Sequence, residues 1–95
     1  MRRAEALAIL HAHREELRQR HVTSLALFGS VARDEARPDS DVDLLVEFDE
    51  TPSLLTLIAL EQKLSELLGA EVDLVPRGAL RPAFRPGVAA DLVAV

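Results

Sequence analysis

Residues 28–48 read FGSVARDEARPDSDVDLLVEF, and this stretch joins two short motifs. An FGS motif opens the stretch, and a DVD motif follows after ten residues and runs directly into the apolar segment LLVEF. Polar and apolar residues alternate from Asp41 onward, which predicts a strand on which Asp41 and Asp43 project from the same face. The stretch therefore predicts both a strand and a pair of carboxylates directed toward a common point.

The turn before these carboxylates has residue types that bind phosphate. Gly29 allows the backbone to turn sharply and to approach a ligand closely. Ser30 and the amides of the following turn can donate hydrogen bonds to phosphate oxygens. Arg33 can neutralise phosphate charge or pair with a neighbouring acid, and the sequence leaves both readings open. Gly29, Ser30 and Arg33 are the candidate nucleotide-binding residues.

A third acid completes the set of candidate catalytic and metal-binding residues, Asp41, Asp43 and Asp73. Asp73 lies between two aliphatic residues in the segment EVDLV, so register between neighbouring strands would bring it beside the other two acids. Carboxylates are ligands that Mg²⁺ prefers, and three of them can bridge two ions about 3.5–4 Å apart. The alternative for Asp73 is a solvated acid on an exposed sheet face.

The order of expected elements predicts a small α/β fold, an α+β sandwich with a mixed sheet of three to four strands and helices packed on one face. The expected elements are a helix at 2–20, strands at 22–28, 42–48 and 70–75, a helical turn capped by Ser30, a helix at 53–68 capped by Ser53 and ended by Gly69, and short or broken helices in the tail at 80–92. Residues 1–95 are expected to form one domain, because a chain of this length supports one hydrophobic core.

Composition removes several classes of function. The net charge of −5 is the wrong sign for gripping a nucleic-acid backbone, so polymeric nucleic acid is disfavoured as a substrate. The chain has no Cys, which excludes disulfides, zinc–thiolate sites and thiol nucleophiles. The stretch 4–20 is repeatedly charged and offers no apolar segment for a signal peptide or a membrane span, so we expect a cytoplasmic protein with no membrane partner.

The stretch GSVARDEARPDSDVDLLVEF resembles the signature of the DNA polymerase beta nucleotidyltransferase superfamily, and the whole chain resembles its minimal nucleotidyltransferase (MNT) branch. The resemblance implies the nucleotidyltransferase fold, a nucleotide-binding Gly29-Ser30 turn, and a metal-binding Asp41-Asp43 pair completed by Asp73. Members commonly pair with a helical HEPN-domain protein, which is a ribonuclease toxin in several systems, and act as antitoxins by attaching AMP to it. The chain departs from the pattern at Asp34, where many members have Gly, and at 85–87, where Pro and Gly interrupt a tail that is often more helical.

These observations predict a Mg²⁺-dependent nucleotidyltransferase that transfers AMP from ATP to a hydroxyl group of a partner protein, as an antitoxin of a HEPN-type toxin. One alternative is a non-catalytic module that binds nucleotide or blocks a toxin. Another is transfer to a small-molecule acceptor, although larger relatives use an added domain for that purpose. The sequence leaves the donor base and homo-oligomerisation open.

Overall fold

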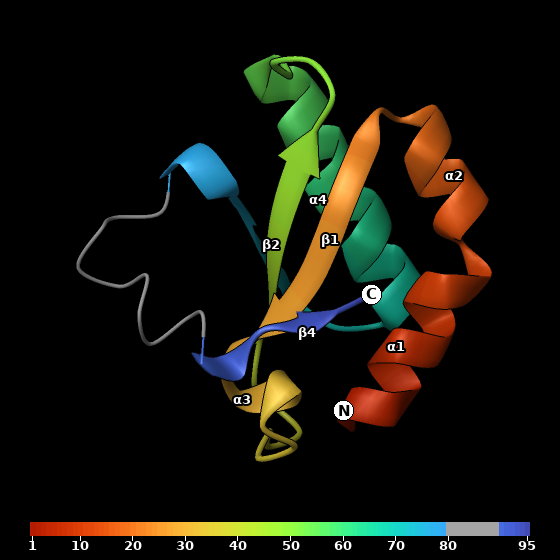
Figure 1. Ribbon diagram of the computed structural model, residues 1–95. Coiled ribbons are helices and arrows are strands. Elements are labelled where there is room, and N and C mark those ends of the chain that lie inside the picture. The colour runs from red at the N-terminus through yellow and green to blue at the C-terminus, as the bar shows by residue number, and fades with distance from the viewer. Residues whose placement is uncertain (80–89) are drawn as a thin grey trace.

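The computed structural model describes residues 1–79 and 90–95 (Figure 1). Its elements in chain order are α1 Arg3–Ala12, α2 Arg14–Gln19, β1 Val22–Phe28, α3 Gly29–Ala32, β2 Val42–Phe48, α4 Leu54–Leu68, β3 Val72–Pro76, a 3₁₀ helix (η1) Arg77–Ala79, and β4 Val93–Ala94. The four strands form one sheet in the order β3-β2-β1-β4. Within the described residues, none of the helices has both the length and the apolar character needed to cross a membrane.

The sheet is mixed, as predicted. β1 runs antiparallel to β2 and to β4, whereas β2 and β3 are parallel. Parallel neighbours need a crossover connection, and α4 supplies it between β2 and β3. Because β2 and β3 point the same way, their first residues lie at the same edge of the sheet, next to the end of β1.

The hydrophobic core lies between the helices and one face of the sheet. Alternate residues of β2 point into this core, and Val42, Leu44 and Val46 are at most 1% exposed. The buried helical side chains that meet them are Ala6, Leu10, Leu17, Leu60, Leu64 and Leu68. Figure 1 shows α1, α2 and α4 gathered on this side of the sheet. The opposite face carries Asp43 and Glu47 of β2, and Asp41 comes immediately before this strand.

Helix α4 begins and ends where the sequence predicts. The hydroxyl oxygen of Ser53 accepts a hydrogen bond from the Thr56 amide at 3.1 Å, which satisfies one of the free donors at the helix N-terminus. Gly69 ends the helix in the left-handed conformation, with φ of 65°. Both end signals are therefore confirmed.

The first helix and the short helical turn differ from expectation. The single helix predicted at 2–20 is divided into α1 and α2 at His13, whose φ of −108° and ψ of 16° are not helical. The amide of His13 bonds to the Leu10 carbonyl three residues back, so the last turn of α1 tightens and the axis changes direction. Ser30 does not cap α3, because this helix already begins at Gly29 and its cap position, Phe28, has no side-chain bond.

The tail ends in a strand that the sequence did not predict. Ala94 and Val93 pair with Ala26 and Leu27 of β1 and form the edge strand β4. The prediction of helices rested on apolar residues spaced by four, and most of that pattern, at 80–89, lies outside the described residues. Within the predicted range, the described residues Ala90 and Asp91 are helical, and β4 begins only at Val93.

Candidate active site

The candidate site lies at the sheet edge where β1 ends and where β2 and β3 begin. Asp43 is paired in register with Phe28 on one side and with Asp73 on the other. The FGS turn, the DVD motif and the third acid are therefore neighbours on three adjacent strands. The register expected for Asp73 is found, while its chemical role stays a prediction.

Gly29 is held directly against Asp43. Its φ is +72°, a conformation that side chains other than glycine rarely adopt. A Cβ atom built on Gly29 would lie 2.2 Å from the Asp43 carboxylate oxygen Oδ2, which is well inside van der Waals contact. Only glycine therefore lets the turn after β1 and the carboxylate on β2 occupy these positions together.

Asp43 has the perturbed carboxyl group of the site. Partial burial raises the pKa of Asp43 above its ordinary value of 3.8, and the charges of Asp73 and Asp41 raise it further. The cationic Arg33 lowers this pKa in part. Asp43 is half-buried, whereas Asp41 and Asp73 are exposed. Three acids thus share one edge of the sheet, and their mutual repulsion favours a cation among them.

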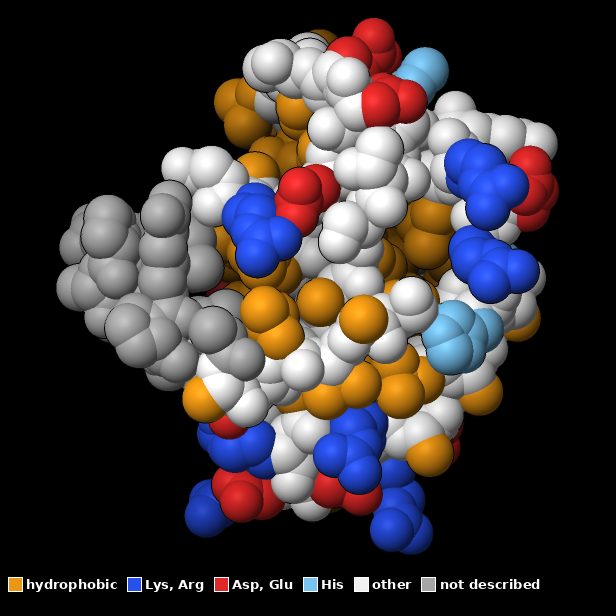
Figure 2. Space-filling view, viewed as in Figure 1, with side chains coloured by type: hydrophobic (Ala, Val, Ile, Leu, Met, Phe, Trp, Pro, Cys, Tyr) orange, Lys and Arg blue, Asp and Glu red, His pale blue; other side chains and the backbone are white. Residues whose placement is uncertain are grey.

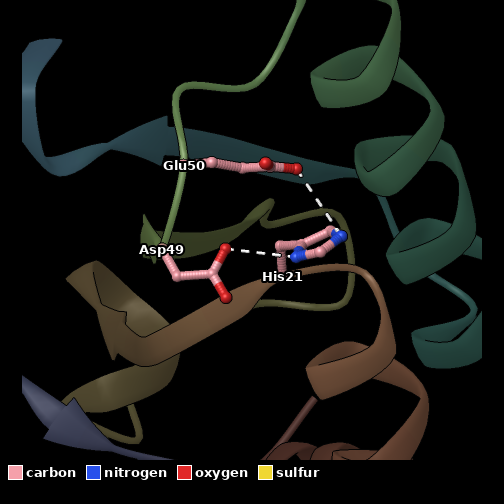
Figure 3. A group of neighbouring side chains, drawn as sticks. All are labelled: His21, Asp49 and Glu50. Atoms are coloured by element: carbon pink, nitrogen blue, oxygen red, sulfur yellow. Dashed lines mark ion pairs between the residues drawn. The ribbon is translucent and has the colours of Figure 1, made fainter.

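A different group of metal-ligating side chains lies at the other end of β1 and β2. Among the described residues, His21, Asp49 and Glu50 are the set whose ligand atoms all lie within 4.8 Å of one another (Figure 3). His21 Nδ1 is 3.2 Å from Asp49 and Nε2 is 3.5 Å from Glu50, so the three exposed side chains already form ion pairs. The carboxylate oxygens of Asp41, Asp43 and Asp73 do not all lie within 4.8 Å of one another.

Arg33 is held by two carboxylates. Its Nη1 donates to Asp91 Oδ2 at 2.7 Å, and its Nε donates to Glu35 at 3.2 Å. The hydrogen bond to Asp91, and then that to Glu35, raise the pKa of Arg33 above its ordinary value. The sequence left two roles open for Arg33. The structure shows that Arg33 pairs with acids, whereas its binding to phosphate stays a prediction. Sequence reasoning did not single out Asp91, because 58 positions separate the partners and no local motif marks an acid in this tail.

The turn that contains Ser30 and Arg33 is fixed by contacts with α1. Asp34, the residue that departs from the family pattern, has φ of 59°, so it takes up the left-handed conformation that glycine would adopt easily. Its Oδ1 accepts a hydrogen bond from the Arg3 amide at 3.0 Å, which is one of the free donors at the start of α1. The departure therefore keeps the shape of the turn and adds a tie to α1.

Arginines gather around this turn despite the net negative charge of the chain. Arg3 Nη1 donates to the Ala32 carbonyl at 3.2 Å, and Arg2 lies 3.9 Å from Asp34. Figure 2 shows cationic and acidic side chains mixed at the end of the molecule where α3 lies. Farther along β2, Glu47 pairs with Arg77 of η1, so it has a cationic partner of its own and is not a fourth acid of the site.

The chain is similar in sequence to a known protein family. Residues 10–93 match the nucleotidyltransferase domain family. The chain belongs to this family. MntA, a protein adenylyltransferase of Thermococcus cleftensis, is 48% identical over 92 residues, which cover 96% of this chain and 93% of that protein. A protein adenylyltransferase assigned in Methanocaldococcus jannaschii is 45% identical over 94 residues, covering 97% and 96% of the two chains.

Solved structures show the same nucleotidyltransferase fold. A protein assigned as a minimal nucleotidyltransferase superposes with a TM-score of 0.85 at 37% identity, over 100% of this chain and 97% of that one. A toxin–antitoxin structure with AMP-PNP has a TM-score of 0.73 at 22% identity, over 99% of this chain and 72% of that one, and shows likeness of fold. A minimal nucleotidyltransferase antitoxin in complex with a tri-AMPylated HEPN toxin of Shewanella oneidensis has a TM-score of 0.70 at 22% identity, over 94% and 70% of the two chains.

Proposed function

We propose that this nucleotidyltransferase transfers AMP from ATP to a hydroxyl group of a partner protein, and that the partner is a HEPN-type toxin. The observation that carries the proposal is the placement of Gly29 against Asp43 with Asp73 in register beside it. Support comes also from full-length relatives named as protein adenylyltransferases. The fold likeness to toxin–antitoxin complexes suggests the class of partner.

The residues of the sheet edge fit a magnesium site. Asp41, Asp43 and Asp73 would hold one or two Mg²⁺ ions, which neutralise the triphosphate and lower the pKa of the attacking hydroxyl. The fit rests on the donor set, which is three carboxylates whose charges raise the pKa of Asp43. It rests also on Gly29, whose missing side chain leaves the Asp43 oxygen accessible from the phosphate-binding turn.

In the proposed reaction the protein contributes mainly orientation and charge. The Gly29-Ser30 backbone and the Ser30 hydroxyl hold the phosphates, and Arg33 offsets their charge. The acceptor oxygen forms a bond to the α-phosphorus of ATP while the bond to pyrophosphate breaks. The hydroxyl proton leaves through Asp73, whose exposed carboxylate is open to solvent. No covalent intermediate with this chain is required.

The chain offers a convenient property for testing the acceptor, because it contains no Tyr. Any tyrosine-linked AMP formed in the reaction therefore belongs to another protein. We expect incubation with α-labelled ATP, Mg²⁺ and a purified HEPN partner to label the partner, with the adduct mapped by mass spectrometry. Asp41→Asn and Asp43→Asn should each reduce the labelling rate by about 100-fold or more, because each removes charge and a ligand oxygen.

The controls separate this proposal from its rivals. Glu66→Gln removes an exposed acid on α4, which packs on the face of the sheet opposite the acids, and should label the partner at the wild-type rate. Tight binding of the partner with no label under any nucleotide would favour a blocking module instead. Label recovered only on small molecules would overturn the assignment of a protein acceptor.

A further inference from the structure

The segment 90–95 lies next to the candidate site, because β4 pairs with the end of β1. Val93 pairs with Leu27, one residue before the FGS turn begins, and the amide of Val95 donates to the Leu25 carbonyl at 2.9 Å. These bonds attach the segment to the edge of β1. Asp91, which lies two residues before this pairing, is thereby brought beside the turn that we propose for phosphate binding.

Asp91 makes the shorter of the two hydrogen bonds that hold Arg33. Its Oδ2 is 2.7 Å from Nη1, whereas the Glu35 carboxylate is 3.2 Å from Nε. The Asp91 side chain is also better shielded from water, at 26% exposed against 67% for Glu35. A short hydrogen bond between charged groups is stronger when it is shielded, so Asp91 is the main determinant of where the guanidinium lies.

The guanidinium keeps donors for a second partner. Among residues 1–79 and 90–95, no acceptor for Arg33 Nη2 is present. Arg33 directly follows α3, and its backbone amide donates to the Gly29 carbonyl at 3.2 Å. A guanidinium has five donors in a rigid plane, so a carboxylate that binds one edge fixes the direction of the others.

We propose that Asp91 is a positioning residue, which fixes the Arg33 guanidinium so that its remaining donors meet the triphosphate bound at the Gly29-Ser30 turn. This inference rests on the proposed nucleotidyltransferase function. Asp91 touches neither the nucleotide nor the reacting atoms, and it acts through Arg33 alone. The segment 90–95 is then part of the nucleotide site as well as an edge of the sheet.

If Asp91 contributed only its charge, removing that charge would change nucleotide affinity in the opposite direction to the one that positioning predicts. ATP is highly anionic, so neutralising a nearby acid should tighten nucleotide binding if the acid only contributes charge. Loss of positioning weakens binding, because the free arginine must then be ordered on each binding event. The sign of the change in affinity thus distinguishes a positioning residue from a nearby charge.

The experiment is titration calorimetry with Mg²⁺ and AMP-PNP on the full chain. Asp91→Asn should weaken nucleotide affinity by about three- to tenfold, the cost of ordering one long side chain. Glu35→Gln is the matched control, because it removes the other acid on Arg33, and it should leave affinity unchanged or slightly tighter. Asp91→Glu keeps the charge and should restore most of the loss. Unchanged or tighter binding by Asp91→Asn would overturn the proposal.

A double-mutant cycle tests whether Asp91 acts through Arg33. In the Arg33→Gln background, Asp91→Asn should cause no further loss of affinity. A further loss of similar size would instead show that Asp91 supports the site through β4. Arg33 is 43% and Asp91 26% exposed, and neither belongs to the hydrophobic core, so each variant should fold with a melting temperature close to that of the wild type.

Kinetics give a second readout. Asp91→Asn should raise the KM for ATP while the rate of partner labelling at saturating ATP changes little. A fall in that rate with an unchanged KM would contradict positioning of the nucleotide. Absence of Mg²⁺-dependent nucleotide binding in the wild type would overturn the proposed function itself, whereas wild-type binding that Asp91→Asn does not weaken would overturn this inference alone.

Discussion

Two glycines in this chain share one backbone conformation but differ in their surroundings. Gly29 and Gly69 have φ of 72° and 65°, so both would be strained by any side chain. A Cβ atom at Gly69 would meet nothing within 4 Å, whereas one at Gly29 would strike the Asp43 carboxylate. The comparison therefore separates the conformational cost of a side chain from the cost of displacing Asp43.

We expect Gly69→Ala to lower the free energy of unfolding by about 1–2 kcal/mol, the cost of a left-handed alanine, and to leave nucleotide binding unchanged. Gly29→Ala should carry the same conformational cost and should also abolish Mg²⁺-dependent nucleotide binding, because the Asp43 oxygen must move. Urea unfolding and calorimetry measure the two effects separately. Equal nucleotide affinities in the two variants would show that the contact between Gly29 and Asp43 is unimportant for the site.

Among the elements, α4 is the connection that makes β2 and β3 parallel. Its start is capped by Ser53 and its end is tied to β3, since the Ser65 hydroxyl oxygen accepts a hydrogen bond from the Val72 amide at 3.2 Å. The capped start lies at the end of β2 that is opposite the candidate site. Changes at Ser53 should therefore affect stability without affecting the chemistry.

Ser53→Ala should lower the free energy of unfolding by about 1 kcal/mol, because the Thr56 amide loses its acceptor. Ser53→Asp is the matched control and should keep wild-type stability, since aspartate caps a helix equally well and its charge suits a helix N-terminus. Chemical denaturation of the three proteins measures this. Loss of AMP transfer in Ser53→Ala at a temperature where it is folded would show that α4 is coupled to the site.

The elements also show which parts of the fold a sequence can predict. The limits of α4 and the alternation in β2 follow from local signals, namely Ser53, Gly69 and the polar residues between aliphatics. The strand at Val93 depends on pairing with β1, which is distant in sequence, and the break at His13 comes without Gly or Pro to mark it. The meeting of Gly29 with Asp43 was predictable because two motifs lie at a fixed spacing, and the place of Asp73 followed from strand register, while their chemical roles stay predictions. The contact between Asp91 and Arg33 was not predictable, because the two residues are remote in sequence.

For the whole molecule, the acids at the sheet edge bear on folding as well as on the proposed chemistry. The pKa of Asp43 is higher in the folded chain than its ordinary value of 3.8. The folded state therefore binds its proton more tightly than the unfolded state does. The contribution of Asp43 to stability is fully present below pH 3.8 and is lost as the pH rises through the raised pKa.

We expect Asp43→Asn, without metal, to be more stable than the wild type at pH 7, with an advantage that shrinks as the pH falls to 3.8 and below. Mg²⁺ should raise the melting temperature of the wild type at pH 7 and should not raise that of the variant. Thermal melts across this pH range, with and without Mg²⁺, measure both effects, and Glu66→Gln controls for the loss of one charge. A constant difference at all pH values would contradict the raised pKa.

The shared register of Asp43 and Asp73 constrains how the coding sequence can change in length. Side chains alternate along a strand, so a slip of β3 by one residue would bury Asp73 and turn Val72 and Leu74 outward. Codons gained or lost in the loops around α4 leave the strands free to keep their pairing, because the buried aliphatics fix it. A single codon gained within β3 would separate the acids and damage the core together. Selection that acts only on folding therefore also preserves the spacing of the acids.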